Sequence, residues 1–329
     1  MAGERERWIE RIRFLLERAG FYVADTHGIR PSSFDLAARR DQTLLLVKVL
    51  KNIDALDADE ARRLGELGDL FPAIVLVVGQ TSGAADLDGG VVYTRYGIPI
   101  ITEGTLQEFL EKALPPFLYA SPGGTFARID GERLRALRVA HGLSLGTLAN
   151  VAGVSRRAIQ LYEDGAGAEM SVIDRIEAYL GEPIVRPMDL FDAPRPRAAP
   201  DSGEASPSHD AEPTERALPP TGDPWRDGIL QQLDGMGLEV TVTMRAPFDA
   251  LGRTPDVLLA AIGSLRTALH RAEMLQGLAR VAEGHAMFVV RESVHRPSIG
   301  GLAVLNAKEL RRHRDPDELL DEITERERP

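Results

Sequence analysis

The chain has 329 residues, 43% of them hydrophobic, and a formal net charge of −11 from 39 basic and 50 acidic side chains. This length exceeds one ordinary hydrophobic core, so we expect several domains. Cysteine is absent, which excludes disulfides, thiolate nucleophiles and cysteine-ligated metal sites. The seven histidines show no metal-binding spacing, and we expect neither a metal ion nor a cofactor.

The first 20 residues carry apolar side chains at helical spacing between charges. This pattern predicts an amphipathic helix rather than a signal peptide. No apolar run reaches the length of about 18 residues that a membrane-spanning helix needs. We therefore expect a cytoplasmic protein that does not contact a membrane.

Residues 1–114 alternate between helical and strand patterns, which predicts a compact α/β domain. The continuous apolar run at 73–79 is typical of a buried strand. A hairpin of two strands is expected within residues 34–50. The other expected elements are helices at 1–20, 57–70 and 105–114, a strand at 21–25, and one or two short strands within 90–102.

The hairpin at 34–50 carries an aspartate early, Asp35, and a lysine late, Lys48. With this order of elements and these two residues, the domain resembles the restriction-endonuclease-like fold. The resemblance implies that Asp35 is the first metal ligand and Lys48 the catalytic lysine. Magnesium-dependent cleavage of a phosphodiester needs at least two carboxylates to hold the ion. Leu46 stands where the second is required, so we expect an inactive domain that is kept for binding or dimerisation.

Two other interpretations of this hairpin stay open. Asp54 or Asp57, from the following segment, would replace the missing ligand if the protein were a metal-dependent, structure-selective DNA nuclease. In an unrelated α/β fold, Asp35 and Lys48 would instead form a structural salt bridge. The glycines of SPGGTF, residues 121–126, lack the lysine and the strand-to-helix context of a phosphate-binding loop.

Residues 115–127 form a connector with two turn signals, in which we expect a small hairpin. A helical domain is expected at 128–192 because its pattern is wholly helical from 130 to 180. Residues 128–160 hold six arginines against two acids, whereas residues 161–180 hold one arginine against five acids. This polarity is expected when one end of a small domain faces DNA.

The stretch GLSLGTLANVAGVSRRAIQLYEDG, residues 142–165, has the spacing of two helices joined by a tight turn. Ser144 and Ser155 are suited to cap the two helices, and Gly153 supplies the left-handed conformation of the turn between them. The second helix buries Ile159 and leaves its N-terminal face exposed. That is the face which a recognition helix offers to the major groove of DNA.

The exposed face of this second helix carries Arg156, Arg157 and Gln160. Arginine pairs bidentately with guanine or clamps phosphates, and glutamine reads adenine. The helix expected before the motif, at residues 131–141, can add phosphate contacts through Arg133, Arg135 and Arg138. The alternative is an ordinary helical hairpin with a solvated arginine face.

With SLGTLANVAGVSRRAIQLYEDG, the segment resembles the phage-repressor (Cro/C1-type) helix-turn-helix family. The resemblance implies a five-helix DNA-binding domain that acts as a homodimer on a palindromic operator. Carried over by position, it implies DNA contacts from the recognition helix and a backbone contact from Ser144. The expected DNA-binding residues are therefore Ser144, Ser155, Arg156, Arg157, Ala158, Gln160, Leu161, Arg133, Arg135 and Arg138.

A wider resemblance is carried by AGFYVAD, SSFDLAARRD, LLLVKVLKNID and YASPGGTFARIDGERLR. These stretches, in this order, are similar to the archaeal HTH-type transcriptional regulatory proteins, which have a central repressor-type domain. The match covers residues 1–192 well and the C-terminal part loosely. It implies a transcriptional regulator and names neither a ligand nor a target gene.

Residues 193–223 are rich in proline, alanine, serine and acids, so we expect a disordered linker. Residues 224–329 then repeat the first domain in outline, with Phe248-Asp249 in place of Phe34-Asp35 and Ile262 at the position of Lys48. We therefore expect a second, diverged copy of the α/β domain. Two unrelated α/β domains with common patterning are the alternative.

The sequence thus predicts an α/β plus all-α protein: a nuclease-like domain, a central helix-turn-helix domain and a second nuclease-like domain. We expect a non-enzymatic, homodimeric transcriptional regulator whose partner is double-stranded DNA. The two α/β domains would dimerise, sense a small-molecule effector of unknown identity, or contact DNA nonspecifically. A protein-interaction scaffold that no longer binds DNA is a further alternative.

Overall fold

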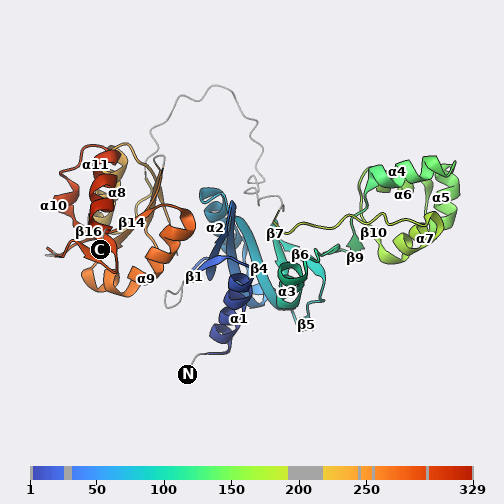
Figure 1. Cartoon of the computed structure of the whole chain (residues 1–329), viewed down its shortest axis with the longest axis horizontal. Coiled ribbons are helices and arrows are strands. Elements are labelled where there is room, and N and C mark those ends of the chain that lie inside the picture. Colours follow the sequence, from blue (N-terminus) through green and yellow to red (C-terminus); the bar gives the residue numbers. More distant parts are fainter. Residues whose placement is uncertain are drawn as a thin grey trace. The chain divides into compact units, whose positions relative to one another are not determined.

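The computed structural model describes residues 3–25, 32–191, 218–243, 246–253, 256–293 and 296–327, and Figure 1 shows the course of the chain. The strands of these residues form two mixed sheets, and the helices α4 to α7 of a central domain (within 131–180) lie in the sequence between β9 (Gly124–Ala127) of the first sheet and the first strand of the second sheet. No helix of the described ranges is both long enough and apolar enough to cross a bilayer.

The elements predicted for residues 1–114 are present. Helix α1 (Glu4–Arg18) turns its apolar residues inward, and Ile12 and Leu16 are completely buried. The predicted hairpin is formed by β2 (Leu36–Arg40) and β3 (Thr43–Asn52). The remaining elements are β1 (Tyr22–Asp25), η1 (Ile53–Ala55), α2 (Ala58–Leu70), β4 (Ile74–Ser82), β5 (Ala85–Asp86), β6 (Val91–Arg95), β7 (Ile98–Ile101) and α3 (Glu103–Lys112).

The first sheet has the strand order β1-β2-β3-β4-β7-β6 and then continues through β8 (Leu118–Ser121), β9 (Gly124–Ala127) and β10 (Ala168–Glu169), while β5 pairs with β4. β1, β2 and β3 are antiparallel, β4 and β7 are parallel, and β6 is antiparallel to β7. The small hairpin predicted in the connector is formed by β8 and β9. Because β9 pairs with β10, which lies between two helices of the central domain, this hairpin joins that domain to the sheet.

The central domain contains α4 (Gly131–Ala140), α5 (Leu145–Ala152), α6 (Arg156–Glu163) and α7 (Met170–Leu180) around a core of its own. The expected count of five helices is corrected to four for the described residues 128–191. Pro183 and Pro187 interrupt the segment where a fifth helix would lie, since proline breaks a helix interior. The segment instead pairs with the chain that enters the domain, through an antiparallel bridge between Ile129 and Val185.

The second sheet and its helices are formed by the C-terminal residues. Residues 193–217 of the expected linker lie outside the described residues. In its last part, 218–223, Leu218 packs against the core of the second sheet and Asp223 caps the next helix. The elements that follow are α8 (Pro224–Gly235), β11 (Glu239–Val242), β12 (Ala250–Arg253), β13 (Val257–Gly263), α9 (Leu265–Ala282), β14 (His285–Val290), β15 (Ser298–Ile299), β16 (Leu302–Asn306), α10 (Ala307–Leu310) and α11 (Pro316–Glu327).

The second sheet has the order β11-β12-β13-β14-β16-β15, which repeats the order β1-β2-β3-β4-β7-β6 of the first. The register agrees as well, because the amide of Asp35 donates to Val47 O and the amide of Asp249 donates to Ala260 O, both at 2.9 Å. This register places Ala261 at the position of Lys48. The expectation of Ile262 there was wrong by one residue, because an alignment of apolar runs does not fix the strand register.

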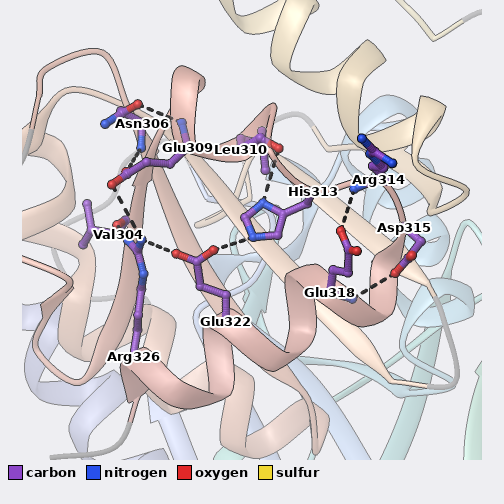
Figure 2. Close-up of polar contacts among 10 residues, drawn as sticks. All are labelled: Val304, Asn306, Glu309, Leu310, His313, Arg314, Asp315, Glu318, Glu322 and Arg326. Atoms are coloured by element: carbon purple, nitrogen blue, oxygen red, sulfur yellow. Dashed lines mark hydrogen bonds and ion pairs between the residues drawn. The ribbon is translucent and has the colours of Figure 1, made fainter.

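Helix α11 is fastened to the second sheet by a polar network around Arg326 (Figure 2). Its guanidinium contacts Glu322 on the same helix, the carbonyl of Val304 on β16, and Glu309 on α10 at 3.6 Å. His313 lies beside this network, with Nε2 against the carboxylate of Glu322. The network therefore stabilises the packing of the last helix against β16 and α10.

By its internal contacts the described chain divides into two compact units. One unit contains residues 3–8, 49–65 and 74–191, and so includes the central helical domain. The other contains residues 9–25, 32–48 and 66–73 together with the described part of 218–327. The hairpin β2–β3, as far as Lys48, and the second sheet therefore belong to the same unit.

Candidate nucleic-acid interface

The predicted helix-turn-helix is formed by α5 and α6. The hydroxyl of Ser144 caps α5 by accepting from the amide of Thr147 at 3.0 Å, and the hydroxyl of Ser155 caps α6 by accepting from the amide of Ala158 at 3.1 Å. Gly153 ends α5 at φ 69°, in the left-handed region that favours glycine. These three residues fix where α5 begins and ends and where α6 begins.

The face of α6 predicted to meet DNA is exposed. Arg156, Arg157 and Gln160 are all exposed, Leu161 is 49% exposed, and Ala158 is half-buried. This arrangement brings four of the predicted residues onto one accessible surface and leaves Ala158 at its border. The two arginines lie in the first turn of α6, where the amides of the helix N-terminus also favour an anion.

Arg156 lies directly over α5. A Cβ atom at Gly146 would come within 2.8 Å of Nε of Arg156, so the guanidinium occupies space that any larger residue at position 146 would take. The glycine therefore allows the arginine to lie close to α5. The sequence pattern gave no indication of this role for Gly146.

The arginines predicted on α4 are placed differently from those on α6. Arg133 donates to Pro183 O at 2.7 Å and pairs with Glu182, while Arg135 and Arg138 both pair with Glu163. No ion pair or hydrogen bond joins the side chain of Arg156 or Arg157 to any other residue in the described ranges. The α4 arginines therefore hold the domain together, and the α6 arginines are available to a ligand.

Glu163 is the centre of this ion-pair network. Its side chain is buried, and it accepts from Arg138 Nη2 at 3.0 Å and from Arg135 Nε at 3.2 Å. Burial raises the pKa of the Glu163 carboxyl, but the hydrogen bonds from Arg138 and Arg135 outweigh burial and keep this pKa below its usual range. The bond to Glu163 raises the pKa of Arg138 in turn. The network ties the C-terminal end of α6 to α4.

The same end of α6 touches α4 through its backbone. A Cβ atom at Gly131 would lie 2.4 Å from the carbonyl oxygen of Glu163, so only glycine fits this crossing. On the other side of the motif, Arg175 of α7 donates from Nε to Ala152 O at 2.9 Å and closes the end of α5. The position of α6 is thus fixed from α4, and that of α5 from α7.

The hairpin β2–β3 is the second candidate site, and it lacks a metal-binding arrangement. The strand register sets Asp35 opposite Lys48, and it sets Leu46 on the same face, two residues earlier on β3. Leu46 is 1% exposed and has no ligand atom, while Nζ of Lys48 donates to Ser32 O at 2.7 Å. The residues present therefore do not fit the two-carboxylate magnesium site of an active nuclease.

The two acids considered as replacement ligands have structural contacts. Asp54 pairs with Arg95 at 2.8 Å and accepts from the amide of Gly83 at 2.6 Å. Asp57 accepts from the amide of Glu60 at 2.7 Å in the first turn of α2. Across the residues that the structure describes, no group of three acidic or histidine side chains is arranged to hold a metal ion.

In the second sheet domain the equivalent aspartate, Asp249, forms ion pairs with two arginines. Its carboxylate lies 3.0 Å from Arg226 Nη1 and 3.7 Å from Arg271 Nη1, and it accepts a hydrogen bond from the amide of Ile262 at 2.8 Å. Two cations already surround this carboxylate, and Ala261 stands where the first copy has Lys48. This site therefore does not fit a metal ion either.

Two family models match the chain. The model described as "PD-(D/E)XK superfamily domain" matches residues 5–115, and the model described as "Helix-turn-helix" matches residues 134–186. These matches agree with the first sheet domain and with α4–α7. No solved structure matches the chain.

Relatives from archaea match almost the whole chain. A protein of Halorubrum lacusprofundi is 36% identical over 327 residues, which cover 98% of this chain and 97% of that protein. A protein of Methanocella arvoryzae is 36% identical over 326 residues, with the same two coverages, and one of Methanosarcina acetivorans is 34% identical over 330 residues. All three carry the name "Putative HTH-type transcriptional regulatory protein".

Proposed function

Because the chain belongs to the archaeal family of HTH-type transcriptional regulatory proteins, we propose that it recognises specific duplex DNA sequences through α6 and regulates transcription from those sites. The observation that carries the proposal is the pair Arg156 and Arg157. Both are exposed in the first turn of a capped helix, and neither has an ion-pair partner among the described residues. Such a pair is suited to guanine edges or phosphates.

The remaining contacts follow from the exposed face of the motif. Gln160 and Leu161 lie one turn further along α6 and would meet base edges, with Leu161 suited to a thymine methyl group. Ser144 and Ser155 stand at helix N-termini, where their backbone amides and hydroxyls would meet phosphates. Arg133, Arg135 and Arg138 are proposed to act indirectly, because a phosphate contact would require them to leave Glu182 or Glu163.

We further propose that the protein binds as a homodimer to a palindromic operator and that the α/β domains are not catalytic. One motif of this type contacts only one half-site, and a second copy would supply the other. The lack of catalysis is supported by Leu46 in the first copy and by Arg226 and Arg271 around Asp249 in the second. No covalent step is assigned to any residue.

Mapping of the bound sites across the genome of the source organism tests the proposal. The expected result is a small set of sites that share one inverted-repeat motif, placed near promoters whose transcript levels change when the gene is deleted. A mutant gene encoding Arg156→Ala with Arg157→Ala serves as the control and should give no enriched sites. Bound sites without a shared motif, or with the motif retained by the double variant, would contradict the proposal.

A further inference from the structure

The two sheet domains can be aligned residue by residue, because their registers agree. Leu36 pairs with Val47 and Ala250 with Ala260, so the equivalent positions on β2 and β12 differ by 214 (250 − 36), and Arg39 corresponds to Arg253. Leu70, near the end of α2, and Val281, near the end of α9, each stand four residues before the next central strand. Equivalent positions of the two helices are buried: Ala61, Leu64 and Leu67 of α2 correspond to Ala272, Leu275 and Leu278 of α9.

These equivalent residues contact each other reciprocally. Nη1 of Arg39 donates to Val281 O at 3.1 Å, and the guanidinium of Arg253 donates to Leu70 O. The arginine of each copy thus reaches the carbonyl near the helix end of the other copy. Such reciprocal contacts are the property of a two-fold interface: the arginine of each copy binds the same position of the other copy.

The packing around these bonds is close. Helix α9 lies against β1 and β2, and a Cβ atom at Gly277 would come within 3.1 Å of the Cβ of Ala24. Arg39 also pairs with Glu283, just after α9. At the other end of the contact, the rings of Phe71 and Phe248 meet edge to face with centroids 5.7 Å apart.

We propose that the C-terminal copy is the built-in partner of the first sheet domain, so that one chain contains a two-fold pair of nuclease-like domains. The surface made by β1, β2 and the end of α2 recognises a second copy of the same fold. One chain therefore presents a single helix-turn-helix for each such pair. This inference does not depend on DNA binding.

The pairing predicts which residues approach each other. Ala24 meets Gly277 in one half of the interface. Since Ala24 corresponds to Thr241 on β11, and Gly277 to Glu66 on α2, the second half should bring Thr241 to Glu66. The chain contains no cysteine, so cysteines introduced in pairs can report both approaches without a background.

The experiment uses the full chain with two cysteine pairs, Ala24→Cys with Gly277→Cys and Glu66→Cys with Thr241→Cys. Disulfides require Cβ atoms about 3.5–4.5 Å apart, which the first pair reaches with a small shift. The control is Ala24→Cys with Leu269→Cys, since Leu269 is 61% exposed on α9. Each protein is oxidised at several concentrations, and free thiols and mobility on a nonreducing gel are measured.

The expected result is loss of both thiols within a single chain for the two test pairs, at every concentration, and free thiols in the control. Closure of only the first pair would overturn the two-fold relation. Disulfides between two chains would show that the partner belongs to another molecule, and free thiols in both test pairs would show that the copies do not meet.

Discussion

Helix α6 and hairpin β2–β3 are the two candidate nucleic-acid sites considered among the described residues, and they differ in which of the expected side chains they hold. At α6 the N-terminal cap and the preceding turn glycine are present, together with two arginines that have no ion-pair partner among the described residues. In the hairpin Asp35 and Lys48 are retained, while the required carboxylate is replaced by the buried Leu46. A sheet domain keeps its fold without its metal ligands, because the strands need only apolar residues and a register. A recognition surface cannot lose its exposed side chains and still bind.

The same comparison separates two kinds of arginine within the helical domain. Arg135 and Arg138 are held by the buried Glu163, whereas Arg156 and Arg157 face outward. Residue type and net charge are equal in the two pairs, and only the neighbours differ. The partner residue therefore decides whether an arginine stabilises the domain or remains available to DNA.

Removal of the central carboxylate should give the largest loss of stability. Glu163→Ala leaves Arg138 partly buried without its partner, and breaking a buried pair in this way costs about 3 kcal/mol in free energy of unfolding. Chemical denaturation followed by circular dichroism measures the change. Glu169→Ala is the matched control, because Glu169 is exposed and makes no capping hydrogen bond, and it should change stability little. Equal stability of the two variants would show that the network is unimportant.

A smaller loss is expected in the second sheet domain. Asp249→Asn removes the charge that faces Arg226 and Arg271, both partly exposed, and should lower the free energy of unfolding by about 1–2 kcal/mol. Asp234→Asn, at an exposed position of α8, provides the control for the same change of side chain. An increase in stability would mean that Asp249 keeps a role other than this ion pair.

Acid should weaken the helical domain in a way that depends on Glu163. Its pKa is lower in the folded protein than in the unfolded chain, so its contribution is complete above the unfolded value and is lost as the pH falls through the folded one. Stability of the wild type should therefore decline below about pH 4 more steeply than that of Glu163→Gln. Parallel pH profiles for the two proteins would contradict the assignment.

No cleavage is expected from the hairpin. Incubation of the pure protein with magnesium or manganese and with linear or branched DNA should leave the DNA intact, because the second carboxylate is missing. Asp35→Ala is the control that identifies the source of any cutting. Metal-dependent cutting that this variant abolishes would establish an active nuclease and overturn the non-catalytic proposal.

Much of the fold was predictable from local patterns. The continuous apolar run of β4 and the alternation of charges with apolar residues in α1 are short-range signals, and both elements were confirmed. The helix-turn-helix was predictable because Ser144, Gly153 and Ser155 each act within a few residues of themselves. The expectation of a fifth helix in the central domain, which came from the family resemblance, was wrong because Pro183 and Pro187 interrupt that segment.

Features that depend on residues distant in sequence could not be read in the same way. Glu163 lies 25 residues from Arg138, and nothing in the sequence of either helix shows that they pair. The contact between Gly146 and Arg156, and the reciprocal bonds of Arg39 and Arg253, appear only in three dimensions. The register error at Ile262 has the same origin, since one residue of slip leaves an apolar strand apolar.

The most direct test of DNA recognition by α6 is the ratio of affinities for the operator and for a scrambled duplex of the same length, measured by gel shift at one fixed salt concentration. Arg156→Ala with Arg157→Ala should lose about 2–6 kcal/mol of this discrimination, from two lost arginine contacts, with an unchanged circular dichroism spectrum. Arg128→Ala with Arg186→Ala removes the same charge from exposed positions of the domain outside α6, and should keep the ratio. An undiminished ratio in the α6 variant would contradict the proposed mode of recognition.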